Sequence, residues 1–123
     1  MKTAAVTILL MALCCGFSTS AESPRLESWY KSDNAAYFGG KLPTDTIVRY
    51  GPLGDRLGLT TKIDGVFVIT IDPKWAPAPV TQQETLLHEE CHVETWDELV
   101  SHGPRWQACM HLLYMNHAFD GLL

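Results

Sequence analysis

Apolar residues recur at helical spacing in three segments of the chain, and β-branched runs fill the stretch between the first and the second. The helical segments cover residues 24–38, a segment opening at Thr81 and a segment opening at Pro104. Proline suits the first turn of the first and last segments, and Thr81 with Glu84 forms a capping-box pattern at the start of the second. The pattern therefore predicts one helix near the N-terminus and two near the C-terminus.

Three strands are predicted between the first helix and the second. They cover residues 46–50, 57–62 and 66–72, and Asp64-Gly65 marks a hairpin turn between the last two. The run VFVITI at 66–71 is apolar on both faces apart from one threonine, which favours a central position in the sheet. The order of elements is typical of an α+β fold, with a three-stranded sheet that we expect to be antiparallel.

The first 21 residues differ in kind from the rest. Lys2 precedes a run of 14 almost wholly apolar residues over 4–17, and small residues follow up to Ala21. This order predicts a secretory signal peptide over 1–21. The apolar run is shorter than the ~20 residues that a membrane span needs. We therefore expect an exported protein, periplasmic or secreted, with no transmembrane segment in the mature chain.

Size and charge narrow the class of protein further. The chain has 123 residues and a formal net charge of −5, and loss of Lys2 with the signal peptide leaves 102 residues at −6. One domain over 22–123, acting as a monomer, is the expectation at this length. The acidic balance argues against a nucleic-acid partner. Such a small domain buries only ~60–70% of its unfolded surface, so a metal or a disulfide would help to stabilise it.

The four cysteines fall into two pairs. Cys14 and Cys15 lie in the signal peptide, where lipid attachment is the less favoured alternative because no small residue precedes them. Cys91 and Cys109 remain in the mature chain. An oxidising compartment permits a disulfide between them, and two buried free thiols are the alternative.

The segment His88-Glu89-Glu90-Cys91-His92 carries the most specific chemical signal. Residues four apart on a helix project from the same face, so both histidines can bind one Zn²⁺. Glu89 lies beside the first ligand, where it can act on a zinc-activated water without binding the metal itself. This is the HExxH pattern of zinc metallopeptidases.

A catalytic zinc needs a third protein ligand. The spacing of known zincin classes does not supply one, since Thr95 and Glu98 stand where a metzincin has glycine and histidine, and no glutamate follows Glu98. The remaining candidates are His102, His111, His117 and Asp120. His102 is favoured, because it lies in the break before the last helix with enough preceding chain to fold back.

In combination, these residues resemble the SprT-like zinc metallopeptidases. HEECH is followed by His102-Gly103-Pro104-Arg105-Trp106 and Met110, and the upstream segment YFGGKLP at 37–43 is similar to a segment of the same family. The resemblance covers roughly residues 25 to 121. It implies a minimal zincin-like domain, one zinc held by His88, His92 and His102, Glu89 as catalytic carboxylate, and a sheet edge that aligns an extended peptide.

The expected function is hydrolysis of peptide bonds in a protein or peptide substrate. Better-known family members act on proteins crosslinked to DNA, but this chain is acidic and has no CxxC pair, so that role is not carried over. The alternative is a catalytically silent zinc-binding interaction module, or a structural zinc closed by a fourth ligand. The sequence identifies no oxyanion donor with certainty: Arg105, Tyr114 and Tyr50 are candidates, each more readily assigned a structural role.

Two further groups of residues have plainer interpretations. The acidic run at 89–98 is expected to be mostly a solvated helix face, with Glu89 as the exception. Trp29, Trp75 and Trp106 are expected in the core.

Overall fold

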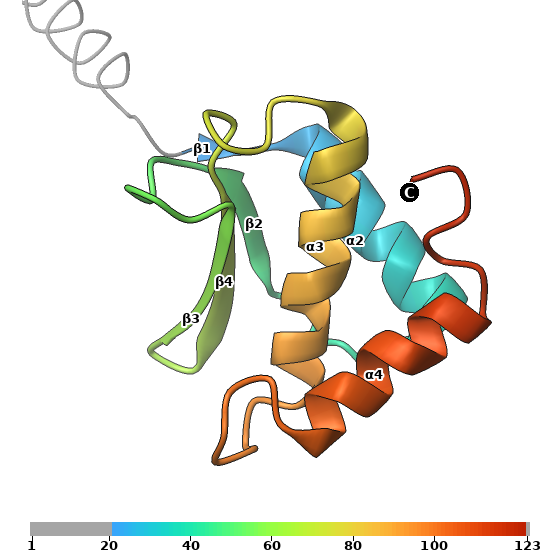
Figure 1. The fold of residues 1–123 in the computed structure, drawn as a ribbon. Coiled ribbons are helices and arrows are strands. Elements are labelled where there is room, and N and C mark those ends of the chain that lie inside the picture. The colour runs from blue at the N-terminus through green and yellow to red at the C-terminus, as the bar shows by residue number, and fades with distance from the viewer. Residues whose placement is uncertain (1–20, 123) are drawn as a thin grey trace, which may run out of the picture.

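The computed structural model describes residues 21–122, so the predicted signal peptide lies almost entirely outside the described part of the chain. The elements are β1 (Ala21–Glu22), α2 (Pro24–Tyr37), β2 (Ile47–Tyr50), β3 (Gly58–Ile63), β4 (Val66–Ile71), α3 (Pro79–Glu94) and α4 (Pro104–Met115). This is the predicted α+β order, with the very short β1 added (Figure 1). Within 21–122, none of the helices combines the length and the apolar character that crossing a bilayer would require.

The sheet is mixed, which corrects the expectation of an antiparallel sheet. Its strand order is β1-β2-β4-β3. The hairpin of β3 and β4 is antiparallel as predicted, but β2 pairs with β4 in parallel, with Ile47 opposite Val68. The loop between β2 and β3 carries the chain to the far edge, and β4 then returns into the position between them. The local residue pattern does not show which strand lies between β2 and β3. The direction of β2 relative to its neighbour therefore could not be predicted from the sequence.

The apolar run of β4 is the centre of the sheet, as the sequence predicted. Every residue from Phe67 to Ile71 is buried. The hairpin turn before it places Asp64 and Gly65 at φ 51° and 81°. These two left-handed residues form the kind of turn whose twist matches that of paired strands.

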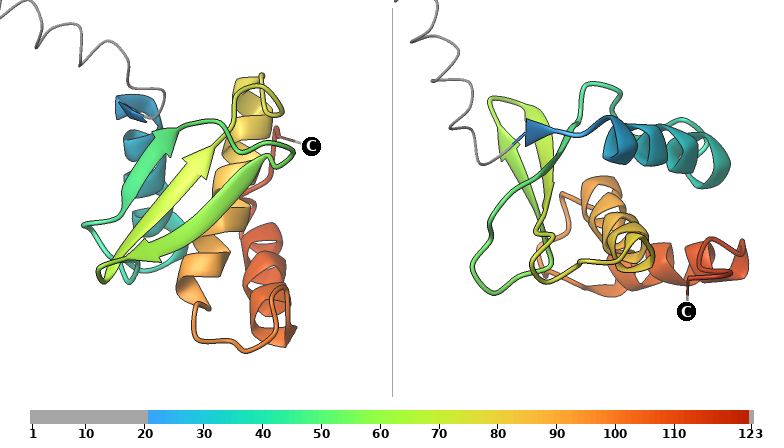
Figure 2. Two further views of the ribbon diagram at one scale, coloured as in Figure 1. Left: turned by 90° about the vertical axis from the view of Figure 1, so that its left-hand side faces the viewer. Right: turned by 90° about the horizontal axis from the view of Figure 1, so that it is seen from above.

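Helix α3 packs on the sheet and lies between α2 and α4 (Figures 1 and 2). The core fills the space between these layers, and its members include Leu26, Val48, Ile69, Ile71 and Leu86, all with no exposed surface. The site described below therefore lies on the most enclosed helix of the molecule.

The start of α3 differs from its prediction. The helix begins at Pro79 with Ala78 as N-cap, and no side chain caps it, so the proposed capping box of Thr81 and Glu84 is wrong. Proline at the first helical position needs no amide partner and can start the helix two residues earlier. Gln82 is buried instead, and its amide donates to the Ala76 carbonyl at 2.9 Å.

A disulfide joins Cys91 of α3 to Cys109 of α4, with the Cα atoms 5.8 Å apart. Of the two alternatives left open by the sequence, the bridge is therefore the one present. It ties the two C-terminal helices together covalently, next to His92 in the sequence of α3.

The acidic run of α3 is not a solvated face throughout, because Glu90 is completely buried. Neither of its carboxyl oxygens has a hydrogen-bond partner among residues 21–122. Burial raises the pKa of Glu90 well above its ordinary value, and the Asp33 carboxyl of α2 raises it further. Burial likewise raises the pKa of Asp33 to about 6. Asp33 thus disfavours the charged form of Glu90, whereas the interaction with Glu90 lowers the pKa of Asp33 and offsets part of the rise that burial causes there.

This pair makes stability fall as the pH rises. A carboxyl group whose pKa is higher in the folded chain than in the unfolded chain binds more protons when folded, so stability decreases from about pH 4 upward through its folded pKa. We expect Glu90→Gln to raise the free energy of unfolding at pH 8, and the gain to shrink toward pH 4.5. Urea unfolding across this pH range measures it.

The matched control is Glu94→Gln, the same substitution at an exposed position of the same helix. It should leave the pH dependence unchanged. A Glu90→Gln protein whose stability follows the wild-type pH curve would show that Glu90 is ionised without cost in the folded chain.

Candidate metal centre

Helix α3 presents His88 and His92 on one face, one turn apart, as the HExxH spacing requires. Their ring centroids are 5.0 Å apart, and both side chains are half-buried. The helix is held from behind by the buried residues Leu86, Leu87 and Cys91. The two imidazoles are therefore carried on a rigid element that packs against the core.

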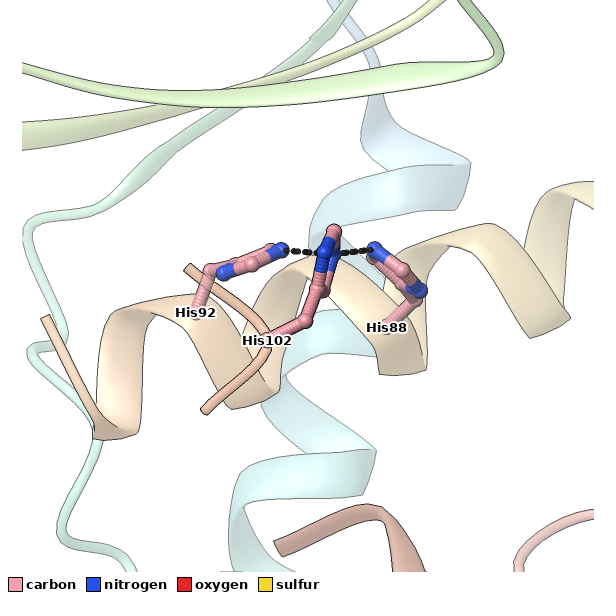
Figure 3. Close-up of side chains that lie close together, drawn as sticks. All are labelled: His88, His92 and His102. Carbon is pink, nitrogen blue, oxygen red and sulfur yellow. Dashed lines mark hydrogen bonds between the residues drawn. The ribbon is translucent and has the colours of Figure 1, made fainter. Parts of the chain in front are cut away.

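His102 reaches the same point from the loop between α3 and α4. Its Nε2 atom lies 3.0 Å from Nε2 of His92 and 3.1 Å from Nε2 of His88 (Figure 3). These are the residues of the described chain that meet as a possible metal site. Of the other candidates, His117 pairs with Asp120 at the surface at 3.1 Å, and His111 stays outside the cluster.

The loop carrying His102 is held by the start of α4. The carboxylate of Glu98 accepts hydrogen bonds from the backbone amides of Arg105 at 2.7 Å and Trp106 at 3.0 Å. His102 itself has φ 57°, and a Cβ on Gly103 would lie 2.8 Å from the Glu98 side chain and from a backbone oxygen. The His-Gly-Pro sequence is thus a tight entry into α4 that directs the imidazole back to α3. Glu98 has a capping role that the interpretation of a solvated face did not include.

The three histidines fit a metal ion better than a set of hydrogen bonds. An imidazole nitrogen has one proton or one lone pair, so Nε2 of His102 cannot form good hydrogen bonds to both neighbours. Nitrogens bound to one tetrahedral zinc are about 3.3 Å apart, close to the separations seen here. Burial and the neighbouring imidazoles lower the pKa of His88 to about 4, and the same causes lower that of His92. The lowered pKa values favour neutral rings at His88 and His92, as metal binding requires.

Glu89 lies beside this cluster and is almost fully buried, with 4% of its surface exposed. Its Oε1 accepts a hydrogen bond from the Thr60 hydroxyl of β3 at 2.8 Å, and its Oε2 lies 3.6 Å from Nε2 of His88. Burial raises the pKa of Glu89 to about 7, although the Thr60 hydrogen bond and the positive charge of Arg56 act against the increase. One oxygen is anchored, and the other faces the space at the histidines.

Gly58 is a site residue that sequence reasoning missed. It is the first residue of β3, and a Cβ there would lie 2.6 Å from Cγ2 of Thr85 and 3.1 Å from Cγ of Glu89. Only glycine lets the strand approach α3 so closely at the Glu89 carboxylate. No local signal distinguishes this glycine from one in a turn, since the close approach arises from the packing of β3 on α3.

Trp106 is only partly the core residue that was expected. It packs against the core, but its ring also lies 4.4–5.6 Å from the rings of all three histidines. Its Nε1 donates to the His88 carbonyl at 3.3 Å. The Trp106 ring therefore packs against the three imidazoles and restricts their orientation. Trp75, by contrast, is 44% exposed and lies outside the core.

Two of the three candidate oxyanion donors already have structural partners. Arg105 is paired with Asp97 at 2.7 Å, and the Tyr50 hydroxyl donates to Gln82 at 2.7 Å, so both have structural partners. Tyr114 alone lines the cavity beside His88 and Glu89.

Comparison of the chain with models of known protein families, with curated proteins and with solved structures finds no match.

Proposed function

We propose that this chain is an exported zinc-dependent metallopeptidase that hydrolyses peptide bonds in a protein or peptide substrate. The observation that carries the proposal is the position of Glu89, a buried carboxylate anchored by Thr60 and directed at a cluster of three histidines. A site that only binds a metal has no use for a buried carboxylate that lies beside the ligands without belonging to them.

The donor set favours a catalytic zinc over a structural one. Structural zinc sites are usually closed by four cysteine or histidine ligands. Both cysteines of residues 21–122 are joined in the disulfide, so neither can serve as a thiolate ligand. Three histidines leave one coordination position for water or substrate, which is the arrangement of catalytic zinc sites.

In this proposal each group at the site has a separate role in hydrolysis. Zinc, when bound, supplies Lewis acidity for the attacking water and the substrate carbonyl. Glu89 takes the proton of the attacking water at Oε2 and passes it to the leaving amine. Thr60 holds Oε1 so that Oε2 keeps its direction. A bound dication would lower the pKa of Glu89 and would favour its ionised, basic form.

Strand β3 supports an extended substrate. It lies at an edge of the sheet and runs along α3, with Gly58 and Thr60 both close to Glu89. An extended peptide can add to such an edge through backbone hydrogen bonds. The resemblance to SprT-like peptidases implies the same use of the edge.

The disulfide supports the expected location. Disulfides persist in oxidising compartments and are rare in the cytosol, which agrees with a predicted signal peptide over residues 1–21. Periplasm and extracellular space are both compatible with it.

The test combines metal content with turnover. We expect the purified chain to hold about one zinc, measured by elemental analysis, and to cleave an unstructured polypeptide, measured by mass spectrometry of the products. A chelator should stop cleavage, and added zinc should restore it. A chain that holds one zinc but neither cleaves any polypeptide nor binds a hydroxamate would instead be a silent zinc-binding module.

A further inference from the structure

A large cleft opens on one side of the histidine cluster. Its volume is about 780 Å³, within the range of ligand sites in enzymes. His88 and Glu89 line it, but His92 and His102 do not. The cleft is therefore continuous with the catalytic carboxylate and lies toward the N-terminal half of α3.

This position identifies which part of a substrate would occupy the cleft. Glu89 must lie within hydrogen-bond distance of the leaving nitrogen to return the proton. The residue that contributes this nitrogen is thus on the Glu89 side of the metal. Its side chain is the substrate group closest to the cleft.

The lining indicates the chemistry of that side chain. Leu57 before β3, Met110 and Tyr114 of α4, and Phe119 after α4 supply apolar walls. Leu57 is 44% exposed and Tyr114 is 61% exposed, so a bound apolar group would cover surface that now faces water. Such burial is the main source of binding free energy for an uncharged group.

Charge gives no competing preference. Arg56, Glu84 and Glu89 line the cleft; the formal charges of Arg56 and Glu84 cancel, and the Glu89 carboxylate is directed at the histidine cluster. A charged substrate side chain would meet one attractive and one repulsive partner, together with the cost of leaving water.

We propose that this cleft binds the large apolar side chain of the residue that follows the scissile bond, so that the enzyme cuts before residues such as leucine, methionine or phenylalanine. The inference rests on the proposed function and adds the substrate class to it. Met110 and Tyr114 are the specificity-determining residues, because they form the wall that faces Glu89 from α4.

The experiment measures binding rather than turnover. Hydroxamates that differ in one substituent (methyl, isobutyl, benzyl or carboxymethyl) next to the metal-binding group are titrated calorimetrically into the zinc-loaded chain. Isobutyl and benzyl should bind at least about tenfold more tightly than methyl, and carboxymethyl should show no gain.

Variants locate the effect. Met110→Trp fills the cleft and should reduce the preference to less than about threefold. Tyr114→Ala should reduce the preference for large apolar substituents as well. Because Tyr114 is 61% exposed, its removal carries little risk to folding. Leu112→Trp is the matched control on the same helix, since Leu112 is 59% exposed and does not line the cleft.

Three results would overturn the inference, and they can be distinguished from one another. Equal affinity for all substituents removes the specificity but leaves the metallopeptidase proposal intact. A preference that survives both Met110→Trp and Tyr114→Ala places the apolar site elsewhere. Absence of any hydroxamate binding by a chain with one zinc overturns the proposed function and this inference together.

Discussion

Glu89→Gln is expected to reduce peptide hydrolysis by at least about a thousandfold while the chain still binds one zinc. Glutamine has the shape of glutamate and can still accept the hydrogen bond from Thr60, which now spans 2.8 Å. Its amide cannot take a proton from water, so the loss is confined to the chemical step. Initial rates of polypeptide cleavage, with zinc content measured on the same samples, check the result.

The control for this experiment is Glu94→Gln, which places the same substitution at an exposed position one turn past the site. Its rate should equal that of the wild type. In the metal-free chain, where burial raises the pKa of Glu89 to about 7, we also expect Glu89→Gln to be more stable than the wild type at pH 8. Full activity in Glu89→Gln would mean that a different group is the base.

His102→Ala is expected to weaken zinc binding by about a hundredfold or more. His102 and the two histidines of α3 meet at this site, and removal of His102 leaves only the other two. A metal that binds only the folded chain stabilises it by RT ln(1 + [L]/Kd), about 3–4 kcal/mol at 100 to 1,000 times Kd. This gain on zinc addition should be nearly lost in the variant. Zinc titration and thermal unfolding with and without zinc measure both effects.

The control here is His117→Ala, because His117 is an exposed histidine outside the cluster. It should retain wild-type zinc binding. If His102→Ala kept full zinc occupancy and the same stabilisation, the third ligand would be another residue. The hydrogen bonds from the start of α4 to Glu98 would then stabilise the loop between α3 and α4 without placing a metal ligand.

The histidines of α3 illustrate a site that sequence can predict. Both lie on one helix, so their relation follows from helical geometry alone, and no other part of the chain has to be placed. His102 required more, since nine residues separate it from His92 and several loop conformations are open to them. Its position depends on the capping of α4 by Glu98 and on the close approach at Gly103.

Glu90 illustrates the opposite case. It belongs to a run of acidic residues, and such runs are usually solvated, yet it is completely buried next to Asp33 of a different helix. Burial of a residue on α3 depends on which elements cover each side of that helix. Its sequence neighbours carry no information on this, because α2 lies more than fifty residues earlier in the chain.

The sequence by itself determined the α+β order, the hairpin of β3 and β4, and the pairing of His88 and His92 as candidate metal ligands with Glu89 beside them. These features depend on residues close together in the chain, where helical and strand periodicity apply directly. Only the tertiary structure decided the parallel pairing of β2 with β4, the disulfide, the closeness of Gly58 and Thr60 to Glu89, and the apolar cleft beside it. Each of these brings together segments that are distant in sequence, and their contacts are set by how the layers pack around α3.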